Sequence, residues 1–379
     1  MEDKSQNTDQ TKFPIAFVLF LVAGLIIILA AHFLVWFTLV KIFALTVPAR
    51  IILGLVFFIL AISFFPVNAL ATYQAGRLLR VCYFLSGLWL GFFATLFFSF
   101  VALWILYVVN FLVGMEISWR LVTTFLVLLS AAVTLWGMFN AYHPRIRRHH
   151  LKIPKLPPDW RDKKIVQLSD LHLGLSNGAA FLKHVVKMTN RQKPDLIFIT
   201  GDLFDGGDGN LETFVPLLDS LKADQGVYFI TGNHETYLGL EEVFAILGKT
   251  KIQILDDRAV ELSGLRIIGL GYPELSQAED MTNILEKLLD NRQPQILLFH
   301  SPIHLEEFSR LGIDVLFCGH THQGQIFPLG LLTWAIFHGH DRGLSRVGKM
   351  RVYVSSGTGT WGPPVKTSGR TEIAVFKLG

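Results

Sequence analysis

The chain has 379 residues, of which 51% are apolar, and a formal net charge of +4. This length suits two structural units. The net charge is too small to indicate nucleic-acid binding, so no specific binding of DNA or RNA is expected. Only two cysteines are present, Cys82 in an apolar stretch and Cys318 in an expected strand. They exclude a disulfide framework and a cysteine-ligated zinc site.

Four long apolar stretches occupy residues 1–142. Each reaches the roughly 20 residues that a helix needs to cross the hydrocarbon layer. They show little amphipathic periodicity, which argues against buried core helices, and the first is too long for a signal peptide. Because they carry almost no ionisable residue at mid-depth, we expect an anchor or a lipid-access surface rather than a transporter. The expected transmembrane helices run approximately over Phe13–Val40, Arg50–Ala71, Val81–Val108 and Leu121–Tyr142.

The basic residues predict the orientation of these helices. With four spans, both ends of the chain lie on one side of the membrane, and that side carries most of the flanking lysines and arginines. The positive-inside rule therefore predicts a multi-pass protein of the inner (plasma) membrane whose residues after 142 lie in the cytoplasm. The basic stretch 145–150 is then expected against anionic headgroups, either as a simple flank of the last span or as a specific lipid site.

The rest of the sequence predicts a linker and then an α/β domain. Residues 143–163 are first basic and then Pro-rich, as in a linker, and residues 164–379 contain short apolar runs typical of strands covered on both faces. Strands are expected over Lys164–Leu168, Leu196–Thr200, Val227–Thr231, Leu265–Leu270, Gln295–Phe299, Val315–Cys318, Arg351–Ser355 and Glu372–Phe376. Helices are expected over Gly178–Arg191, Leu211–Leu221, Leu240–Leu247, Ala278–Asn291 and Ile303–Leu311.

Five of the expected strands end at an Asp, Asn or His residue. These residues are Asp170 and His172, Asp202, Asn233 and His234, His300, and His320 and His322. The carboxyl ends of strands are where open α/β sheets bind ligands. Residues two apart on an extended backbone leave the same face, so the pairs 170/172 and 320/322 can grip one ion from one side. A set of oxygen and nitrogen donors without thiolates suits Mn²⁺, Fe or Zn²⁺.

Each of these residues alone has an ordinary explanation, because Asp, Asn and His at a strand end commonly cap a turn. The ordered set, with Gly201, Gly232 and Gly319 directly before several of its members, favours a metal site instead. Two metal ions about 3.5–4 Å apart can clamp the attacking and leaving oxygens of an in-line displacement. The pattern therefore favours a phosphoester hydrolase.

Five short motifs resemble, in their order and spacing, those of the calcineurin-like metallophosphoesterase superfamily. They are Ser169-Asp-Leu-His-Leu-Gly174, Gly201-Asp202, Gly232-Asn-His-Glu235, His300 and Gly319-His-Thr-His322. The resemblance covers roughly residues 163–379. It implies a four-layer domain in which two mixed β-sheets pack together with helices on their outer faces. The stretch 355–364 and Gly324-Gln-Ile326 further resemble a membrane-associated bacterial branch. That branch includes enzymes that cleave the pyrophosphate of UDP-diacylglucosamine.

The resemblance also implies a role for each residue of the set. Asp170, His172 and His322 would hold the first metal ion, Asn233, His300 and His320 the second, and Asp202 would bridge both. His234 would bind no metal and would instead stabilise the phosphoryl charge or protonate the leaving oxygen. A hydroxide held between the two metals would attack phosphorus directly, so no phosphoenzyme is expected.

Three further features call for interpretation. Gln323 stands where many relatives have glycine, and it is either a substrate contact that narrows the pocket or a tolerated loop change. In the stretch 338–342, we expect a substrate-facing loop with Arg342 on a phosphate, rather than a third metal site or plain surface polarity. Asp205 and Asp208 follow Asp202 in a Gly-rich run, where a solvated loop is expected.

The expected function is hydrolysis of a phosphodiester or pyrophosphate on a membrane-resident substrate, such as a UDP-diacylglucosamine-type lipid, with two divalent ions and Mn²⁺ as the first choice. The expected partners are the lipid bilayer and a phosphorylated amphipathic or nucleotide substrate. One alternative is a hydrolase for soluble nucleotides or phosphoproteins that is merely tethered to the membrane. Another is a non-catalytic membrane scaffold, which the complete ligand set argues against.

Overall fold

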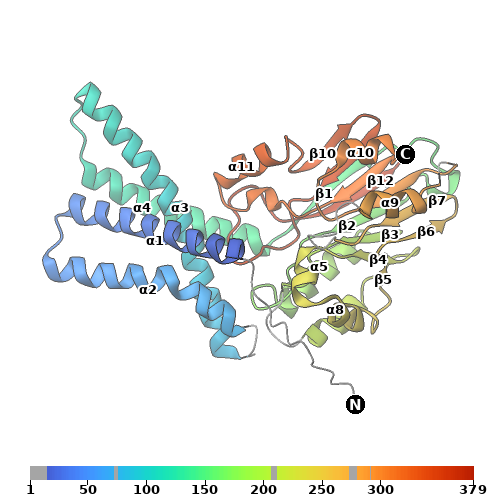
Figure 1. Ribbon diagram of the computed structural model, residues 1–379, viewed down its shortest axis with the longest axis horizontal. Coiled ribbons are helices and arrows are strands. Elements are labelled where there is room, and N and C mark those ends of the chain that lie inside the picture. Colours follow the sequence, from blue (N-terminus) through green and yellow to red (C-terminus); the bar gives the residue numbers. More distant parts are fainter. Residues whose placement is uncertain (1–14, 72–75, 206–210, 273–279, 291) are drawn as a thin grey trace, which may run out of the picture. The chain divides into compact units, whose positions relative to one another are not determined.

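The computed structural model describes residues 15–71, 76–205, 211–272, 280–290 and 292–379 (Figure 1). The chain folds as two compact units. The first comprises residues 1–63 and 99–126, and the second comprises residues 64–98 and 127–379. These units do not coincide with the expected boundaries at residues 142 and 164, because parts of three apolar helices fold together with the α/β domain.

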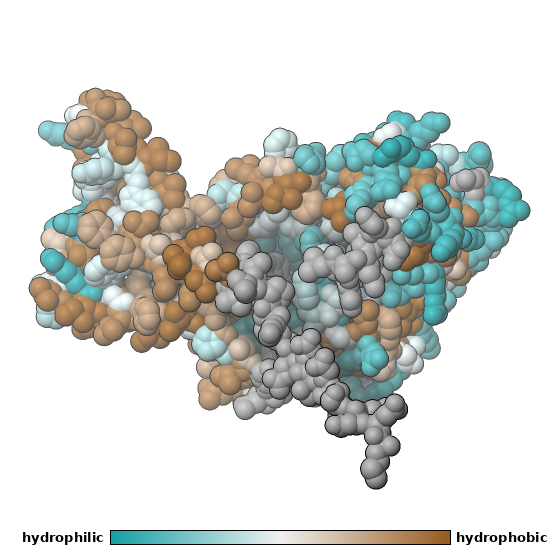
Figure 2. All heavy atoms as spheres, in the orientation of Figure 1, coloured by the Kyte–Doolittle hydropathy of each residue, from teal (hydrophilic) through white to brown (hydrophobic). Residues whose placement is uncertain are grey.

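Four long helices, all apolar, precede the α/β domain, and Figure 2 shows mainly apolar side chains over them. They are α1 (Ile15–Phe43), α2 (Val47–Ala71), α3 (Arg77–Val113) and α4 (Trp119–Tyr142). In length and composition all four can cross a membrane, α1 over Val22–Phe43 and the others over their whole length. They match the expected spans within a few residues, except that the expected start at Phe13 lies outside the described residues.

The α/β domain contains two six-stranded mixed sheets. The first has the order β1-β12-β2-β3-β4-β5, in which only the pair β12–β2 is antiparallel. Its strands are β1 (Arg145–Leu151), β12 (Glu372–Leu378), β2 (Lys164–Leu168), β3 (Leu196–Thr200), β4 (Val227–Ile230) and β5 (Gln253–Ile254).

The second sheet has the order β10-β11-β9-β8-β7-β6. Its two outer pairs are antiparallel and its inner pairs are parallel. Its strands are β10 (Gly343–Val347), β11 (Met350–Val354), β9 (Val315–Cys318), β8 (Gln295–Leu298), β7 (Leu265–Gly269) and β6 (Arg258–Leu262). In both sheets, parallel neighbours bring the carboxyl ends of several strands to one edge.

Successive side chains of a strand point to opposite faces of the sheet, and this alternation explains why each sheet is covered on both sides. In β2, Ile165 belongs to the core between the two sheets, and the next residue, Val166, belongs to the core that covers the outer face of the first sheet. Because both faces are covered, the inner strands are apolar at almost every position. The outer helices are α5 (Ala179–Asn190), α6 (Val215–Leu218) and α8 (Leu240–Leu247) on the first sheet, and α9 (Asp280–Leu288) and α10 (Leu305–Arg310) on the second. The predicted four-layer fold is confirmed.

Several elements differ from the expectation. The stretch 145–151 is strand β1, not part of a linker, and it pairs with β12 in parallel from Arg145↔Glu372 to Leu151↔Leu378. Its charges do not oppose strand formation because it lies at the sheet edge, where Arg147 forms an ion pair with Glu372 at 2.9 Å. Strands β5, β6 and β10, helices α7 (Asn233–Leu238) and α11 (Leu329–Ile336), and the 3₁₀ turns η1 (Pro158–Trp160) and η3 (His322–Gly324) were not expected either. The helix expected over Leu211–Leu221 is present as the 3₁₀ turn η2 (Leu211–Phe214) followed by α6.

Candidate metal centre

The expected ligands lie directly after the carboxyl ends of β2, β3, β4, β8 and β9, where the chain turns sharply. Most non-glycine residues avoid positive φ, but five of the seven expected ligands have it, with φ between 47° and 72°. Backbone strain of this kind persists where surrounding structure holds it, commonly at active sites. The five residues are Asp170, His172, Asp202, His320 and His322.

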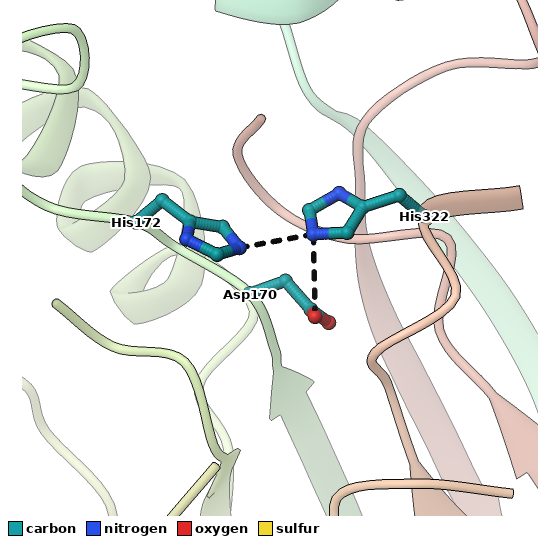
Figure 3. Close-up of side chains that lie close together, drawn as sticks. All are labelled: Asp170, His172 and His322. Atoms are coloured by element: carbon teal, nitrogen blue, oxygen red, sulfur yellow. Dashed lines mark hydrogen bonds and ion pairs between the residues drawn. The ribbon is translucent and has the colours of Figure 1, made fainter. Parts of the chain in front are cut away.

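The first group of ligands consists of Asp170, His172 and His322, whose donor atoms all lie within 4.8 Å of one another. Figure 3 shows the three side chains converging from two separate segments of the chain. The Nε2 atoms of His172 and His322 are 2.9 Å apart, and His322 Nε2 is 3.4 Å from Asp170 Oδ1. This group is the set that the resemblance assigns to the first metal ion.

The second group consists of Asp202, His300 and His320, again with donor atoms within 4.8 Å. Asn233 joins it, because its Oδ1 is 2.9 Å from His320 Nδ1. Asp202 lies between the two groups: its Oδ2 is 3.1 Å from His300 Nε2 and 3.8 Å from His172 Nε2. The structure thus brings all seven expected ligands together, in the grouping that a bridging role for Asp202 requires.

The donor set fits metal ions in two respects. The Nδ1 atom of His300 is 2.8 Å from the Thr200 carbonyl, and Nδ1 of His172 is 3.1 Å from Asp205 Oδ1. With a proton on Nδ1, each imidazole turns its Nε2 toward the site, as metal-bound histidines do. In addition, Asp170 Oδ2 is buried without a hydrogen-bonding partner among the described residues.

Glycines next to the ligands leave them room. A Cβ atom at Gly232 would collide with the Asp202 carboxylate, and one at Gly319 would collide with Ser169 and Asp170. At Gly201 it would collide with the ring of His300. The glycines of the sequence motif are therefore required because the ligands pack directly against the neighbouring backbone.

The carboxylates and histidines of the site shift one another's pKa values in opposite directions. Burial alone would raise the pKa of Asp202, but His300 outweighs burial and lowers this pKa well below its usual value. Burial alone would lower the pKa of His300, but Asp202 raises it to about 10. Burial lowers the pKa of His320 to about 4 and holds that of His322 well below its usual value, so both are neutral, the form that binds metals. The field that holds a proton on His300 also attracts a divalent cation.

Asp205 is a functional residue that the sequence interpretation missed. It was expected in a solvated loop, but only 12% of its side chain is exposed. Its Oδ1 is 3.1 Å from His172 Nδ1 and 3.3 Å from His234 Nδ1. These histidines lower the pKa of Asp205 to about 2 although burial opposes the shift. Asp208, the other residue of that expectation, lies outside the described residues.

His234 lies beside the first group, with its ring centroid 4.6 Å from that of His172. Burial lowers its pKa, but Asp205 and Asp202 outweigh burial and raise it to about 9. The imidazole is therefore positively charged near neutral pH. A cation held at this position can donate a hydrogen bond to a phosphoryl or leaving oxygen, the role predicted for it.

Glu235 holds the loop that carries Asp202. It is fully buried, and its carboxylate accepts four backbone N–H groups, from Gly232, Asp202, Leu203 and Phe204, at 2.7–3.1 Å. The Gly232 group begins α7 and the other three follow β3. The acidic residue of the sequence motif therefore fixes the distance between the ligands of two neighbouring strands.

Parts of three apolar helices, α2, α3 and α4, belong to the same folded unit as the expected ligands. Tyr83 of α3 packs against Leu175, just beyond the first ligand pair, and its hydroxyl faces the Asp205 carboxylate. Gly91 of α3 and Gly137 of α4 contact the loop 363–367 so closely that a Cβ atom on either would lie within 3 Å of Val365 side-chain atoms. No feature of the sequence indicated these contacts, which are formed between distant segments.

The two expected substrate-binding residues are not in the ligand groups. The side chain of Gln323 lies against Gly369, and Arg342 is exposed. Arg342 nevertheless follows a residue fixed to the site, because the Asp341 carbonyl accepts a 2.6 Å hydrogen bond from Thr321, which lies between two ligands. His340 contacts Ser345 at 2.9 Å. A substrate role for Gln323 or Arg342 stays a prediction.

Comparison with known proteins places this geometry in a family. Residues 163–324 match the family model described as calcineurin-like phosphoesterase. The chain is 34% identical over 260 residues to an uncharacterized metallophosphoesterase of Campylobacter jejuni (67% of this chain, 68% of the relative). It is 32% identical over 240 residues to one of Helicobacter pylori (62% and 64%). It is 34% identical over 272 residues to a transmembrane protein with metallophosphoesterase domain of Bos taurus (66% and 61%). The chain thus spans roughly two thirds of each relative's own length.

Proposed function

Because this chain belongs to the calcineurin-like metallophosphoesterases, we propose that it hydrolyses a phosphodiester or pyrophosphate bond in a membrane-resident substrate. A nucleotide-lipid of the UDP-diacylglucosamine type is the first candidate. The observation that carries the proposal is that the ligand groups and the adjoining segments of α3 and α4 fold as one unit. Such a site acts where lipid headgroups are concentrated. The charge distribution supports a cytoplasmic site on the inner (plasma) membrane.

Two divalent ions, Mn²⁺ first and Fe or Zn²⁺ next, would neutralise phosphoryl charge and activate water when bound. Asp170, His172 and His322 would hold one ion, Asn233, His300 and His320 the other, and Asp202 both. The protonated His234, oriented by Asp205, would donate a proton to the leaving oxygen or a hydrogen bond to the phosphoryl group.

The test uses the full chain in lipid nanodiscs, stripped of metal with a chelator and then supplied with Mn²⁺. UDP-diacylglucosamine and a soluble cyclic dinucleotide are offered separately. We expect Mn²⁺-dependent release of UMP from the lipid and little hydrolysis of the dinucleotide. Asp202→Ala is the matched control. Since loss of outer-shell partners of a metal typically costs about 10–100-fold, loss of the shared ligand should cost more.

The other outcomes separate the alternatives. Hydrolysis of the dinucleotide alone would reject the lipid substrate and favour a tethered enzyme for soluble nucleotides. Metal binding without hydrolysis of either compound, or of a generic aryl phosphodiester, would favour the scaffold.

A further inference from the structure

Helix α11 is an apolar helix that presents its apolar side chains to solvent. None of its eight residues is buried, and its large apolar side chains are between 40% exposed at Leu329 and 64% exposed at Leu331. A helix on the surface of a globular protein normally turns an apolar face toward the core. In Figure 2 apolar atoms gather where Figure 1 places α11. The exposed large side chains of this patch are Phe327, Leu329, Leu331, Leu332, Trp334 and Ile336.

The helix is firmly attached at both ends, so its exposure is part of the fold. Before it, the backbone N–H of Phe327 donates to Thr367 Oγ1 at 2.8 Å. After it, the ring of Phe337 packs against the ligand His320 at 6.2 Å between centroids. Midway, Thr333 Oγ1 lies 3.4 Å from the Asp341 carboxylate. The polar contacts of α11 thus lie on its protein side, which leaves the apolar side chains outward.

Thr367, to which the start of α11 is attached, also contacts α4. The methyl group of Thr367, which holds Phe327, lies against Gly137, and the backbone N–H of Lys366 donates to the Gly137 carbonyl at 2.9 Å. Gly137 is close to the end of the candidate membrane span Trp119–Tyr142. The apolar patch therefore begins at the level where α4 leaves the hydrocarbon layer, and it ends against the metal centre.

The composition fits a lipid surface. Residues 323–337 contain no Asp, Glu, Lys or Arg, whereas the next five residues are His338-Gly-His-Asp-Arg342, of which Asp341 is buried. Trp is enriched at the boundary between membrane and water, and helices that lie there bury apolar side chains at the edge of the acyl-chain region. A soluble protein partner does not explain why the patch is continuous with a spanning helix.

We propose that α11 lies in the surface of the bilayer. Its apolar side chains enter the acyl-chain region of the leaflet in which α4 ends, and they hold the metal centre at the level of the lipid headgroups. Lipids can then move along α11 to His320 without leaving the membrane. The occupant of the patch is membrane lipid, whichever phosphoester the enzyme cleaves.

The test measures the environment of α11 in the full chain. In a Cys82→Ser background, Leu331→Cys is labelled with the fluorophore NBD, and the protein is reconstituted into phosphatidylcholine and phosphatidylglycerol vesicles. Cys318 is fully buried and should not react. Lys349→Cys, in the exposed turn between β10 and β11, is the matched control. We expect blue-shifted emission at position 331 that is lost when the lipids carry bromine on their acyl chains, and unchanged, water-like emission at position 349.

Two results would overturn the proposal. Water-like emission at position 331 would mean that α11 is in solvent. Blue-shifted emission that brominated lipids do not quench would mean that protein, for example a second copy of the chain, covers the patch. Because this readout needs no catalysis, it stands apart from a failure of the proposed substrate. A Leu332→Ser/Trp334→Ser variant, still labelled at position 331, should lose the quenching yet hydrolyse a soluble aryl phosphodiester as before.

Discussion

The ammonium group of Lys366 donates a hydrogen bond to the backbone carbonyl of His322 at 2.8 Å and a second one to that of Ser356 at 2.6 Å. Lys366 is fully buried, and burial lowers its pKa to about 8. The Lys366 backbone is in turn bonded to Gly137 of α4. One buried side chain therefore connects an expected metal ligand to α4, a helix long and apolar enough to span a membrane.

Replacing this lysine tests the connection. Lys366→Met keeps the volume but leaves two buried carbonyls without a donor, each at a cost of about 1–3 kcal/mol, partly offset by relief of the buried charge. We expect a lower unfolding temperature and weaker Mn²⁺ binding, measured by thermal unfolding and chelator competition. Lys349→Met, on an exposed turn, should change neither. Equal Mn²⁺ affinity in both variants would show that Lys366 does not position His322.

Replacing Asp205 is predicted to weaken metal binding and catalysis, as loss of a hydrogen-bonding partner of metal ligands usually does. Asp205→Asn weakens the contacts to His172 and His234, so Mn²⁺ affinity and kcat should each fall about 10–100-fold with the fold intact. Isothermal titration with Mn²⁺ and steady-state kinetics measure the two effects. Asp224→Asn, at an exposed position of the same domain, is the control. If Asp205→Asn keeps the wild-type Mn²⁺ affinity and kcat, Asp205 does not support the site, as first expected of a residue in a solvated loop.

Gly137 is predicted to couple α4 to the loop 363–367. A Cβ atom there would lie 2.8 Å from side-chain atoms of Val365 and Thr367, so Gly137→Leu must displace the loop. Overpacking of this kind typically costs about 1–3 kcal/mol, and hydrolysis should fall as the loop moves. Gly24→Leu is the matched control, since a Cβ atom at Gly24 of α1 meets nothing within 4 Å. Full activity of Gly137→Leu would rule out the coupling.

The lowered pKa of His149 in β1 predicts that the free energy of unfolding falls at acid pH. Burial, aided by Arg147 and opposed by Glu372, lowers its pKa, and its Nε2 is buried without a partner among the described residues. The unfolded state therefore binds more protons just below pH 6.5, so stability is full above this pH and falls as pH drops toward the folded-state pKa. His149→Phe keeps the stacking on Phe376 at 5.3 Å and should remove this part of the acid loss in thermal unfolding. His150→Phe, exposed on the same strand, should leave the wild-type pH profile; identical profiles for both variants would refute the assignment.

The sequence by itself determined the two architectures and the ligand set. A long, uniformly apolar segment satisfies its backbone hydrogen bonds in lipid by forming an α-helix, so α1–α4 were predictable within a few residues. Strands such as Leu196–Thr200 were predictable because burial on both faces leaves a continuous apolar run. The clustering of the seven expected ligands was predictable because they follow the carboxyl ends of neighbouring strands.

Only the tertiary structure decided which other residues serve the site. Asp205, Glu235 and Lys366 act through partners that lie up to 44 positions away along the chain, and neither their types nor their neighbours in sequence indicate such partners. Strand β1 was missed because its charges suit an exposed edge, and it becomes a strand only when β12, more than 200 residues later, pairs with it. Helix α11 lacks the amphipathic pattern that marks a surface helix. Local patterns report what a segment buries, whereas positioning contacts between distant segments exist only after the chain has folded.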